Sequence, residues 1–345
     1  MRAAVLAGYR APLRVEDVPD PACPPDGVVL RVLACGVCRS DWHGWTGEHR
    51  LVHPGRILGH EYCGEVVEAG PASGWRVGDR LVAPFILACG LCPSCRAGET
   101  TTCADQVTPG FSAQGAFAEL VAVPRGHNLA RLPEALDPVL AAGLGCRVTT
   151  AWHALTGRAA LGPGEWLAVH GTGGVGLAAV ILGRAMGARV VAVDVVPEKL
   201  ALALRLGAEA AVDARAGDAA QAVRDATGGG AHVSLEALGI AATVDASLRS
   251  LRPLGRHVQA GMPTGRTARM EVDLGALYAG QIAAYGTRGM PAWRFPSLLG
   301  LIEAGRVDLS PLLGRTIGLS GVTDALAAMD GPTSPGAAVV TGFRA

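Results

Sequence analysis

The sequence predicts an α/β protein of two domains, a β-rich domain followed by a doubly wound parallel sheet. Three observations support this prediction: the length of 345 residues, the short β-like runs broken by Pro and Gly in the first part, and the alternation of apolar strands with Ala/Leu-rich helices after about residue 148. Such alternation is typical of βαβ units, which build a parallel sheet. We expect domains at 1–147 and 148–286, with 287–345 returning to the first domain.

The individual elements follow the same pattern. The first domain contains β-like runs at 28–34, 61–70 and 78–84. The second is expected to have strands at 166–170, 189–194, 210–213, 232–236, 256–261 and 282–286, and helices at 174–187, 197–207, 218–228 and 241–251. Two later helices (293–304 and 321–330) and a strand (337–340) have no partners of their own, so we expect them to pack on the first domain.

The composition indicates a globular chain, with 50% hydrophobic and 17% charged residues. The formal net charge is zero, so nothing steers the protein to nucleic acid or to anionic membranes. No run reaches the ~18 apolar residues of a membrane-spanning helix, and the start MRAAVLAGYR is too weakly apolar for a signal peptide. We therefore expect a cytoplasmic protein, in which nine cysteines indicate metal sites before disulfides.

The segment GTGGVG (171–176) follows a predicted strand and begins a predicted helix. Gly171, Gly173 and Gly176 fill the G-x-G-x-x-G positions, where they permit a tight turn, close approach of a pyrophosphate and packing of helix on strand. The N–H groups at the start of such a helix bind phosphate. Because the chain contains 48 glycines, the motif alone is weak evidence.

Asp194 strengthens the dinucleotide interpretation because it ends the next predicted strand, where an acid accepts the ribose hydroxyls of NAD. An NADP site would normally place an arginine just after that strand, whereas the first cation here is Lys199. We predict NAD binding, with Gly174 and Val175 also at the phosphates. The alternative is an ordinary glycine-rich turn with Asp194 as a helix cap.

Four cysteines lie close together in CGLCPSCRAGETTTC, with the pattern C-x2-C-x2-C-x7-C: Cys89, Cys92, Cys95 and Cys103. Four thiolates at this spacing can close a tetrahedron around Zn2+ and leave no open position, which predicts a structural zinc. The alternatives are an iron–sulfur cluster, whose ferredoxin spacing differs, and reduced core cysteines.

The segment ACGVCRSDWHGW (34–45) contains Cys35 and Cys38, whose spacing would also suit a redox pair. Together with His60 and Cys146, however, Cys38 offers Zn2+ two sulfurs and one nitrogen. Such a set leaves a fourth position for water or substrate, which is the arrangement of a catalytic zinc. The three residues are far apart in the sequence, so their spacing is weak evidence.

These motifs together resemble the zinc-containing medium-chain alcohol dehydrogenases. Residues 36–43 match G-x-C-R-S-D-x-H and residues 59–61 match G-H-E, while the four-cysteine lobe, the glycine loop and the late Cys146 also match. The resemblance implies a GroES-like first domain, a Rossmann second domain, two zinc ions per chain, and reversible hydride transfer between an alcohol and NAD.

The resemblance also implies roles for single residues at the catalytic zinc. Cys38, His60 and Cys146 would bind the metal, with Glu61 as a nearby carboxylate or transient ligand. Cys35 would then be a core residue and no part of a redox pair.

A proton released at this zinc needs a route out of a dry site. Ser40 lies two residues after Cys38, and His43 could take the proton onward near the cofactor ribose. A capping serine and a surface histidine are the alternatives. Asp41 would orient the zinc or its ligands.

By resemblance, Arg39 meets the pyrophosphate and Thr150 meets the nicotinamide. Many relatives carry a second pyrophosphate arginine in a G-R-x-V strand near the C-terminus. This chain reads GAAV at 336–339, so that arginine is missing unless Arg344 replaces it.

Trp45, His49 and Phe85 are expected to line the substrate cleft by resemblance, with plain packing as the alternative. Aromatic walls favour an apolar or aromatic alcohol. Polyol dehydrogenases usually carry glutamate at the third zinc position, where this chain has Cys146. We therefore expect primary or secondary alcohols as substrates rather than sugars.

Two other functions remain open at this point. The same fold could serve a biosynthetic carbonyl reductase or a threonine-like amino-alcohol dehydrogenase, and a non-catalytic zinc and dinucleotide binding protein is a further class. Relatives also imply a homotetramer or homodimer, joined through the apolar segment 282–286.

Overall fold

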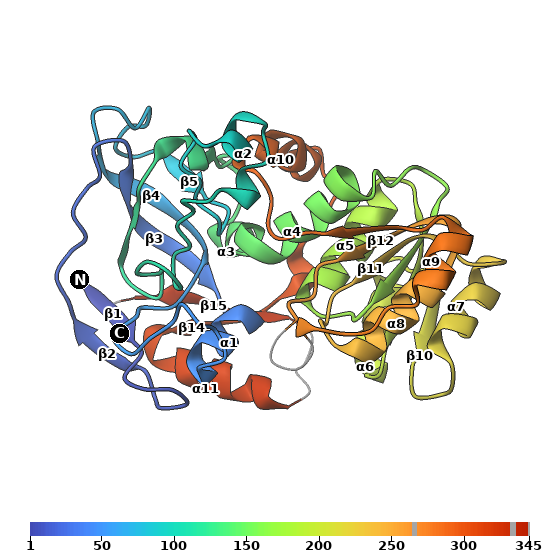
Figure 1. The fold of residues 1–345 in the computed structure, drawn as a ribbon. Coiled ribbons are helices and arrows are strands. Elements are labelled where there is room, and N and C mark those ends of the chain that lie inside the picture. Colours follow the sequence, from blue (N-terminus) through green and yellow to red (C-terminus); the bar gives the residue numbers. More distant parts are fainter. Residues whose placement is uncertain (264–267, 332–335, 344–345) are drawn as a thin grey trace. The chain divides into compact units, whose positions relative to one another are not determined.

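The computed structural model describes residues 1–263, 268–331 and 336–343, so Arg344 lies outside the described residues. The chain forms two compact units (Figure 1). The first comprises 1–149, 289–305 and 310–345, and the second comprises 150–288 and 306–309. The chain therefore leaves the first unit and later returns to it.

A seven-stranded sheet forms the centre of the first unit, with the order β14-β15-β3-β4-β5-β7 and with β6 paired to β3. Strands β3 (Val28–Gly36) and β4 (Glu61–Ala69) are antiparallel neighbours whose register places Gly36 opposite Glu61. The other strands of this sheet are β5 (Arg80–Val82), β6 (Leu120–Val123), β7 (Ala130–Arg131), β14 (Leu313–Gly318) and β15 (Ala337–Gly342), and β1 (Arg2–Val5) pairs with β2 (Arg14–Asp17).

Short helices of the first unit place the candidate site residues. They are α1 (Arg39–Thr46), α2 (Pro93–Arg96), α3 (Pro138–Ala142), α10 (Phe295–Glu303) and α11 (Val322–Ala327). A π-helical turn, Leu144–Val148, leads into α4 (Thr149–His153), with which the chain enters the second unit, and a second π-helical turn of that unit covers Ala154–Arg158. Buried side chains from β3, β4 and the segment 111–123 form one continuous core with residues of α1 and α11.

The second unit contains a six-stranded sheet with the order β10-β9-β8-β11-β12-β13, in which every neighbouring pair is parallel. This is the doubly wound strand order of dinucleotide-binding folds. The strands are β8 (Trp166–His170), β9 (Arg189–Asp194), β10 (Ala210–Asp213), β11 (Ala231–Glu236), β12 (Leu251–Gln259) and β13 (Ala283–Gly286), and the helices are α5 (Gly174–Ala185), α6 (Pro197–Arg205), α7 (Ala219–Thr227), α8 (Ala241–Arg249) and α9 (Leu274–Gly280).

The predicted fold class is confirmed, and most predicted elements are present within a few residues. Strand β12 begins at Leu251, earlier than the predicted 256, because Leu251 already pairs with Ala231 of β11. The predicted residues 256–259 continue this pairing. Helix α9 and strand β14 were not predicted. The exposed side chains of α9 give no core-facing apolar periodicity, and β14 (LGRTIG) contains glycine and arginine, so neither has a strong sequence pattern.

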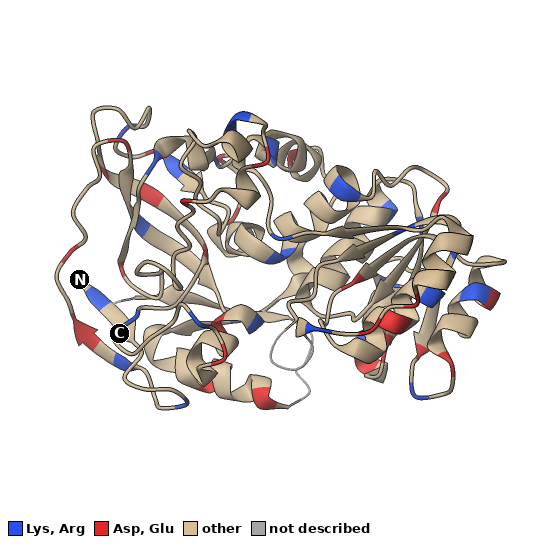
Figure 2. Cartoon of the chain, in the orientation of Figure 1, with Lys and Arg blue, Asp and Glu red and all other residues tan. Residues whose placement is uncertain are grey.

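Charged side chains of both signs are interspersed along both units (Figure 2). This distribution agrees with the zero net charge of the sequence. Among the described residues, no helix is long and apolar enough to cross a membrane.

Candidate active site

The four predicted lobe cysteines come together in the first unit. Their sulfur atoms all lie within 4.8 Å of one another, with Cys92 and Cys95 3.5 Å apart. Backbone N–H groups of Leu91 and Cys92 point at the Cys89 sulfur at 3.4 Å, and the Cys89 N–H points at the Cys103 sulfur at 3.3 Å. A hydrogen bond from the Cys95 backbone lowers the pKa of Cys92 to about 6. By contrast, burial raises the pKa of Cys95 to about 12 and also raises that of Cys103. The geometry of the four sulfurs fits a closed four-sulfur metal site.

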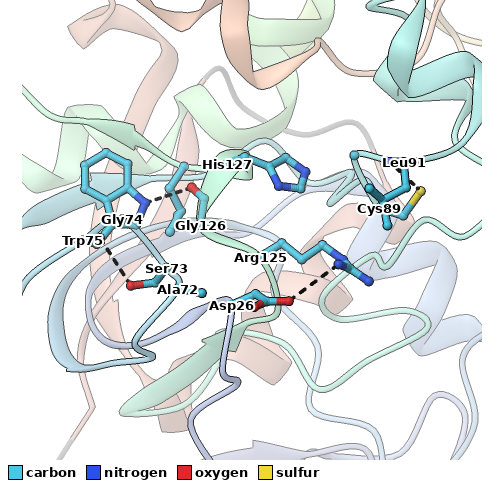
Figure 3. A pocket seen from close by; sticks show the side chains of 12 residues that line it. Asp26, Ala72, Ser73, Gly74, Trp75, Cys89, Leu91, Arg125, Gly126 and His127 are labelled. Carbon is cyan, nitrogen blue, oxygen red and sulfur yellow. Dashed lines mark hydrogen bonds and ion pairs between the residues drawn. The ribbon is translucent and has the colours of Figure 1, made fainter.

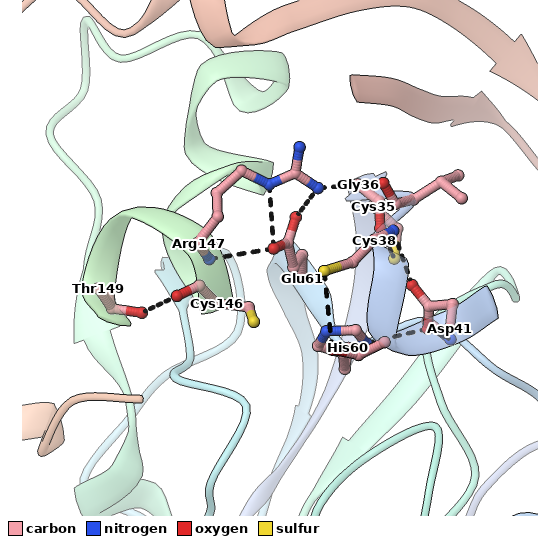
Figure 4. A network of polar contacts seen from close by, with 12 residues as sticks. Cys35, Gly36, Cys38, Asp41, His60, Glu61, Cys146, Arg147 and Thr149 are labelled. Atoms are coloured by element: carbon pink, nitrogen blue, oxygen red, sulfur yellow. Dashed lines mark hydrogen bonds and ion pairs between the residues drawn. The ribbon is translucent and has the colours of Figure 1, made fainter. Parts of the chain in front are cut away.

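A second cluster joins Cys38, His60, Glu61 and Cys146, whose ligand atoms also lie within 4.8 Å of one another. Cys38 is the N-cap of α1, His60 and Glu61 stand at the start of β4, and Cys146 lies in the π-helical turn 144–148. A hydrogen bond with Cys146 lowers the pKa of Cys38 well below its usual value and raises that of Cys146. The fold therefore brings three distant segments to one point (Figure 4).

The side chains of this cluster fit a zinc ion. His60 is fully buried, and its Nδ1–H donates to Asp41 Oδ1 at 2.9 Å. Its other ring nitrogen, Nε2, faces the Cys38 sulfur (Figure 4). Asp41 also accepts hydrogen bonds from the N–H groups of Cys38 (2.9 Å) and Gly59 (3.1 Å). A carboxylate that fixes the far nitrogen of a histidine is typical of metal-binding histidines.

Glu61 makes an ion pair with Arg147, a residue that the sequence did not single out. Both side chains are buried, and Arg147 Nη2 lies 2.5 Å from Glu61 Oε2. Burial raises the pKa of Glu61 to about 7, and the adjacent guanidinium opposes that rise. The sequence did not indicate a role for Arg147, because a single arginine after a cysteine belongs to no recognisable motif.

The proposed relay residues lie on one face of α1. The Cys38 sulfur is 3.9 Å from Ser40 Oγ, and His43 follows Ser40 by three residues, which places the two on the same side of a helix. His43 Nδ1 is 2.6 Å from Glu48 Oε2, a contact that the sequence did not predict. Glu48 is the more exposed partner, at 42% against 15% for His43.

Aromatic rings surround His60. Phe85 packs with Ile86, Cys146 and Cys38 and lies 5.8 Å from the His60 ring, edge on. Phe111, which the sequence did not indicate, lies 5.0 Å from His60 and 4.4 Å from His49. Phe85 and His49 therefore both lie near the second cluster.

Trp45 and Cys35 belong to the core of the first unit. The Trp45 indole N–H donates to the Ala11 carbonyl at 2.7 Å, and the side chain is only 4% exposed. Cys35 is fully buried in the same core, and burial raises the pKa of its thiol well above the usual value. For Trp45 the observed contacts correspond to the packing alternative.

The glycine loop lies between β8 and α5 in the second unit. Gly171 has a φ of +92°, and a Cβ on Gly176 would lie 1.9 Å from the Gly171 carbonyl oxygen, so neither position accepts a larger residue. Gly173 is the N-cap of α5, and Gly174 and Val175 begin the helix. Gly171 and Gly176 thus permit the tight turn and the close packing of α5 on β8 that the G-x-G-x-x-G motif predicts.

Asp194 ends β9 and is 7% exposed. Its Oδ2 accepts hydrogen bonds from the N–H (2.7 Å) and hydroxyl (2.9 Å) of Thr172, and its Oδ1 accepts from the N–H groups of Val195 and Val196 at 2.8 and 3.0 Å. The carboxylate therefore connects the glycine loop to the end of β9. Thr172 is a further residue of this loop that the sequence did not identify.

The remaining cofactor candidates are spread over both units. The Arg39 guanidinium lies over the Trp42 ring at 4.5 Å, and its Nη1 donates to the Met329 carbonyl. Thr150 is buried in α4, and Lys199 lies in the first turn of α6.

A pocket of about 490 Å³ lies beside the four-cysteine lobe (Figure 3). Its lining includes Trp75, Arg125 and His127, and Cys89 is the lobe cysteine that reaches it. None of the residues of the second cluster lines this pocket, so it is separate from the candidate catalytic site.

Comparisons with known proteins agree with this fold and these clusters. Family profiles described as "Alcohol dehydrogenase GroES-like domain" and "Zinc-binding dehydrogenase" match residues 24–134 and 174–304. An alcohol dehydrogenase of Rhizobium meliloti is 38% identical over 270 residues, covering 77% of this chain and 78% of the relative. One from Geobacillus stearothermophilus is 36% identical over 266 residues, covering 76% and 78%.

Solved structures give the same result. Alcohol dehydrogenase TADH from Thermus sp. ATN1 superposes with a TM-score of 0.93 at 30% identity, covering 99% of this chain and all of that one. A zinc-binding dehydrogenase from Sinorhizobium meliloti, solved with NADP, has a TM-score of 0.88 at 29% identity, covering 99% and 98%.

Fold and site together define a zinc dehydrogenase with a GroES-like and a Rossmann domain. The chain belongs to the zinc-containing medium-chain alcohol dehydrogenase family. It is accordingly an oxidoreductase of the alcohol dehydrogenase class, which works with zinc and a nicotinamide cofactor.

Proposed function

We propose that this enzyme converts primary or secondary alcohols, preferably apolar or aromatic ones, into aldehydes or ketones with NAD. The observation that carries the proposal is the set of half-buried Cys38 and buried His60 and Cys146, which offers three metal ligands and leaves one position open. The neighbouring rings of Phe85 and Phe111 support an apolar substrate.

Zinc bound by this set would supply a Lewis acid, which lowers the pKa of a bound hydroxyl group. The side chains of the protein would do the rest. Ser40, beside the Cys38 sulfur, would take the substrate proton, and His43 would pass it on. Glu48 would hold the His43 ring through its contact with Nδ1. The aromatic rings would keep water away from the reacting carbon.

A substrate panel with the purified enzyme tests this proposal. We expect kcat/KM for benzyl alcohol or cyclohexanol with NAD to exceed that for sorbitol or threonine by about 10-fold or more, because apolar walls reward apolar substituents. A preference for sorbitol or threonine would contradict the proposed substrate class.

The proposed preference for NAD rests on Asp194, whose carboxylate at the end of β9 would repel the 2′-phosphate of NADP. We expect Asp194→Asn to lower the NAD-to-NADP ratio of kcat/KM by about 10-fold or more. Asp213→Asn, at the end of the adjacent strand β10, is the matched control and should leave the ratio unchanged. An unchanged ratio in Asp194→Asn would remove the reason for choosing NAD.

We also propose two zinc ions per chain, one in each cluster. Metal analysis should give about two zinc ions per chain in the purified protein. Cys146→Ala and Cys103→Ala should each lower this number by about one. A wild-type value near one would mean that one cluster does not hold metal.

A homodimer or homotetramer is proposed through the edge of the second unit's sheet. Strand β13 is that edge, and nearby apolar side chains are exposed, with Leu274 73%, Tyr278 87% and Tyr285 40% exposed. Light scattering should show an oligomer that Tyr278→Glu dissociates. Val77→Glu, at an exposed valine of the first unit, is the control.

A carbonyl reductase that uses NADPH is the second candidate function. It is favoured by the solved Sinorhizobium meliloti relative with NADP bound. A higher kcat/KM for carbonyl reduction with NADPH than for alcohol oxidation with NAD would favour this second function.

A further inference from the structure

Arg147 is only 5% exposed, and it makes four hydrogen bonds within the first unit. Its backbone N–H and its Nε both donate to Glu61 Oε1 at 3.1 Å, and its Nη2 donates to Glu61 Oε2 at 2.5 Å. The same Nη2 donates to the Val37 carbonyl at 3.0 Å. The guanidinium is therefore held between two other segments of the chain (Figure 4).

Each of these contacts is made directly beside a candidate zinc ligand. Val37 precedes Cys38, Glu61 follows His60, and Arg147 itself follows Cys146. Arg147 is 110 residues from Val37 and 86 from Glu61 in the sequence. One side chain thus joins the three segments that carry the three ligands.

The position of Glu61 is also determined from the opposite side. Gly36 pairs with Glu61 across β3 and β4, and a Cβ on Gly36 would lie 2.7 Å from Glu61 Oε2. The absence of a side chain at Gly36 therefore leaves the space that the carboxylate occupies. In that position both oxygens of Glu61 accept hydrogen bonds from Arg147.

Glu61 has an oxygen close enough to the sulfur and nitrogen ligands to compete for the same ion. A carboxylate ligand would fill the position that a substrate needs, and it would add a negative charge to two thiolates. The ion pair with Arg147 neutralises the carboxylate and occupies its oxygens. A buried ion pair gives little net stability compared with apolar packing, so stability alone does not explain it.

We propose that Arg147 is a positioning residue, which aligns the segments of Cys38, His60 and Cys146 for zinc and holds the Glu61 carboxylate out of the metal's coordination sphere. The proposal rests on the proposed function, since it requires zinc at these three ligands. Arg147 contacts neither substrate nor cofactor in this account, and its effect is exerted through Glu61 and Val37.

The test compares wild type with Arg147→Met, which removes the charge and keeps the length, and Arg147→Lys, which keeps the charge but cannot bind both carboxylate oxygens. Arg256→Met is the matched control in the second unit. Arg256 likewise makes an ion pair with a glutamate, Glu165, and donates to the Ala159 and Ala160 carbonyls, but this pair is half-buried and lies far from both clusters in the sequence.

Zinc release to a chromogenic chelator is the first readout. We expect Arg147→Met combined with Glu61→Gln, in which no freed carboxylate can bind the metal instead, to weaken zinc binding at the second cluster by about 10–100-fold relative to Glu61→Gln alone. The loss should be smaller for Arg147→Lys combined with Glu61→Gln. The four-cysteine lobe should keep its zinc in both variants, and Arg256→Met should release zinc as wild type does.

The visible spectrum after cobalt substitution is the second readout, since it reports the ligand set of the metal independently of turnover. Arg147→Met should show shifted d–d bands, as a freed Glu61 fills the open fourth position with a carboxylate oxygen. Arg147→Met combined with Glu61→Gln should return the spectrum to that of wild type.

A zinc affinity of the double variant equal to that of Glu61→Gln, together with an unchanged cobalt spectrum in Arg147→Met, would overturn the inference while leaving the proposed function intact. If wild type itself shows no thiolate-to-cobalt charge-transfer band that Cys38→Ala removes, the proposed function fails, and the inference fails with it. Should Arg147→Met not fold, Arg147→Lys and Glu61→Gln give the same two readouts.

Discussion

The two metal-binding clusters of the first unit are built in opposite ways. The lobe cysteines lie within one short segment, 89–103, and local backbone N–H groups point at their sulfurs. The second cluster draws Cys38, His60 and Cys146 from three distant segments and depends on Asp41 and Arg147 to align them. A closed site can therefore be local, whereas an open site relies on the surrounding fold to hold its ligands.

The largest expected effect separates the two clusters by activity. Cys38→Ala should lower kcat by at least about 10³-fold, because the open metal position loses a ligand. Cys35→Ala is the matched control: it removes a buried cysteine three residues away and should keep nearly all activity and metal. Comparable losses in both variants would argue for a joint role of the two cysteines.

Removal of a lobe cysteine should lower the thermal stability of the protein rather than its kcat. We expect Cys103→Ala to lower the Tm by at least about 5 °C and to expose the segment 89–103 to proteolysis, since zinc binding there contributes folding free energy. Activity per folded molecule should change by less than about 10-fold. Cys23→Ala, at a half-buried cysteine outside both clusters, should change neither property. A loss of kcat without a loss of Tm in Cys103→Ala would contradict a purely structural role of the four-cysteine lobe.

The loss of stability in acid tests the comparison of the two clusters further. Two buried histidines of the second unit make the protein less stable in acid, and neither belongs to a cluster. Burial lowers the pKa of His170 to about 3 and that of His257 to about 4. Both are neutral in the native state, whereas the unfolded chain takes up a proton on each below its usual value of about 6.5. Stability is therefore complete above pH 6.5 and is lost as the pH falls toward these native values, by about 2 kcal/mol per histidine at pH 5.

Chemical denaturation between pH 7 and pH 5 measures this slope. His170→Leu should remove about half of it, and the slope should persist after metal is removed from both clusters. A slope that disappears with the metal would assign the acid sensitivity to the clusters instead.

The smallest effect is expected when the hydrogen bond from His60 to Asp41 is altered. Asp41→Asn should weaken zinc binding at the second cluster by about 10-fold or somewhat more, because an amide cannot accept hydrogen bonds from Cys38, Gly59 and His60 together. Equilibrium competition with a chelator measures it, with retention of lobe zinc as the internal control. An unchanged affinity would show that the backbone alone orients His60.

Some features of the site could be predicted because their signals are local. The lobe spacing, the glycine loop and Asp194 each depend on a few neighbouring residues. The structure brings the four cysteines together, places the glycines before and at the start of α5, and puts Asp194 at the end of β9. Arg147, Phe111 and Glu48 could not be predicted in this way. Their contacts join residues with no regular spacing, so no sequence period reports them.

By itself, the sequence determined the fold class, the strands and helices α5 to α8 of the second unit, and the clustering of the lobe cysteines, because these depend on hydrophobic periodicity and short-range spacing. Only the tertiary structure decided that Trp45 packs in the core, that Phe111 lies against His60 and that Glu61 pairs with Arg147. The physical reason is that burial and charge pairing between distant segments arise only when the β3–β4 sheet brings those segments together.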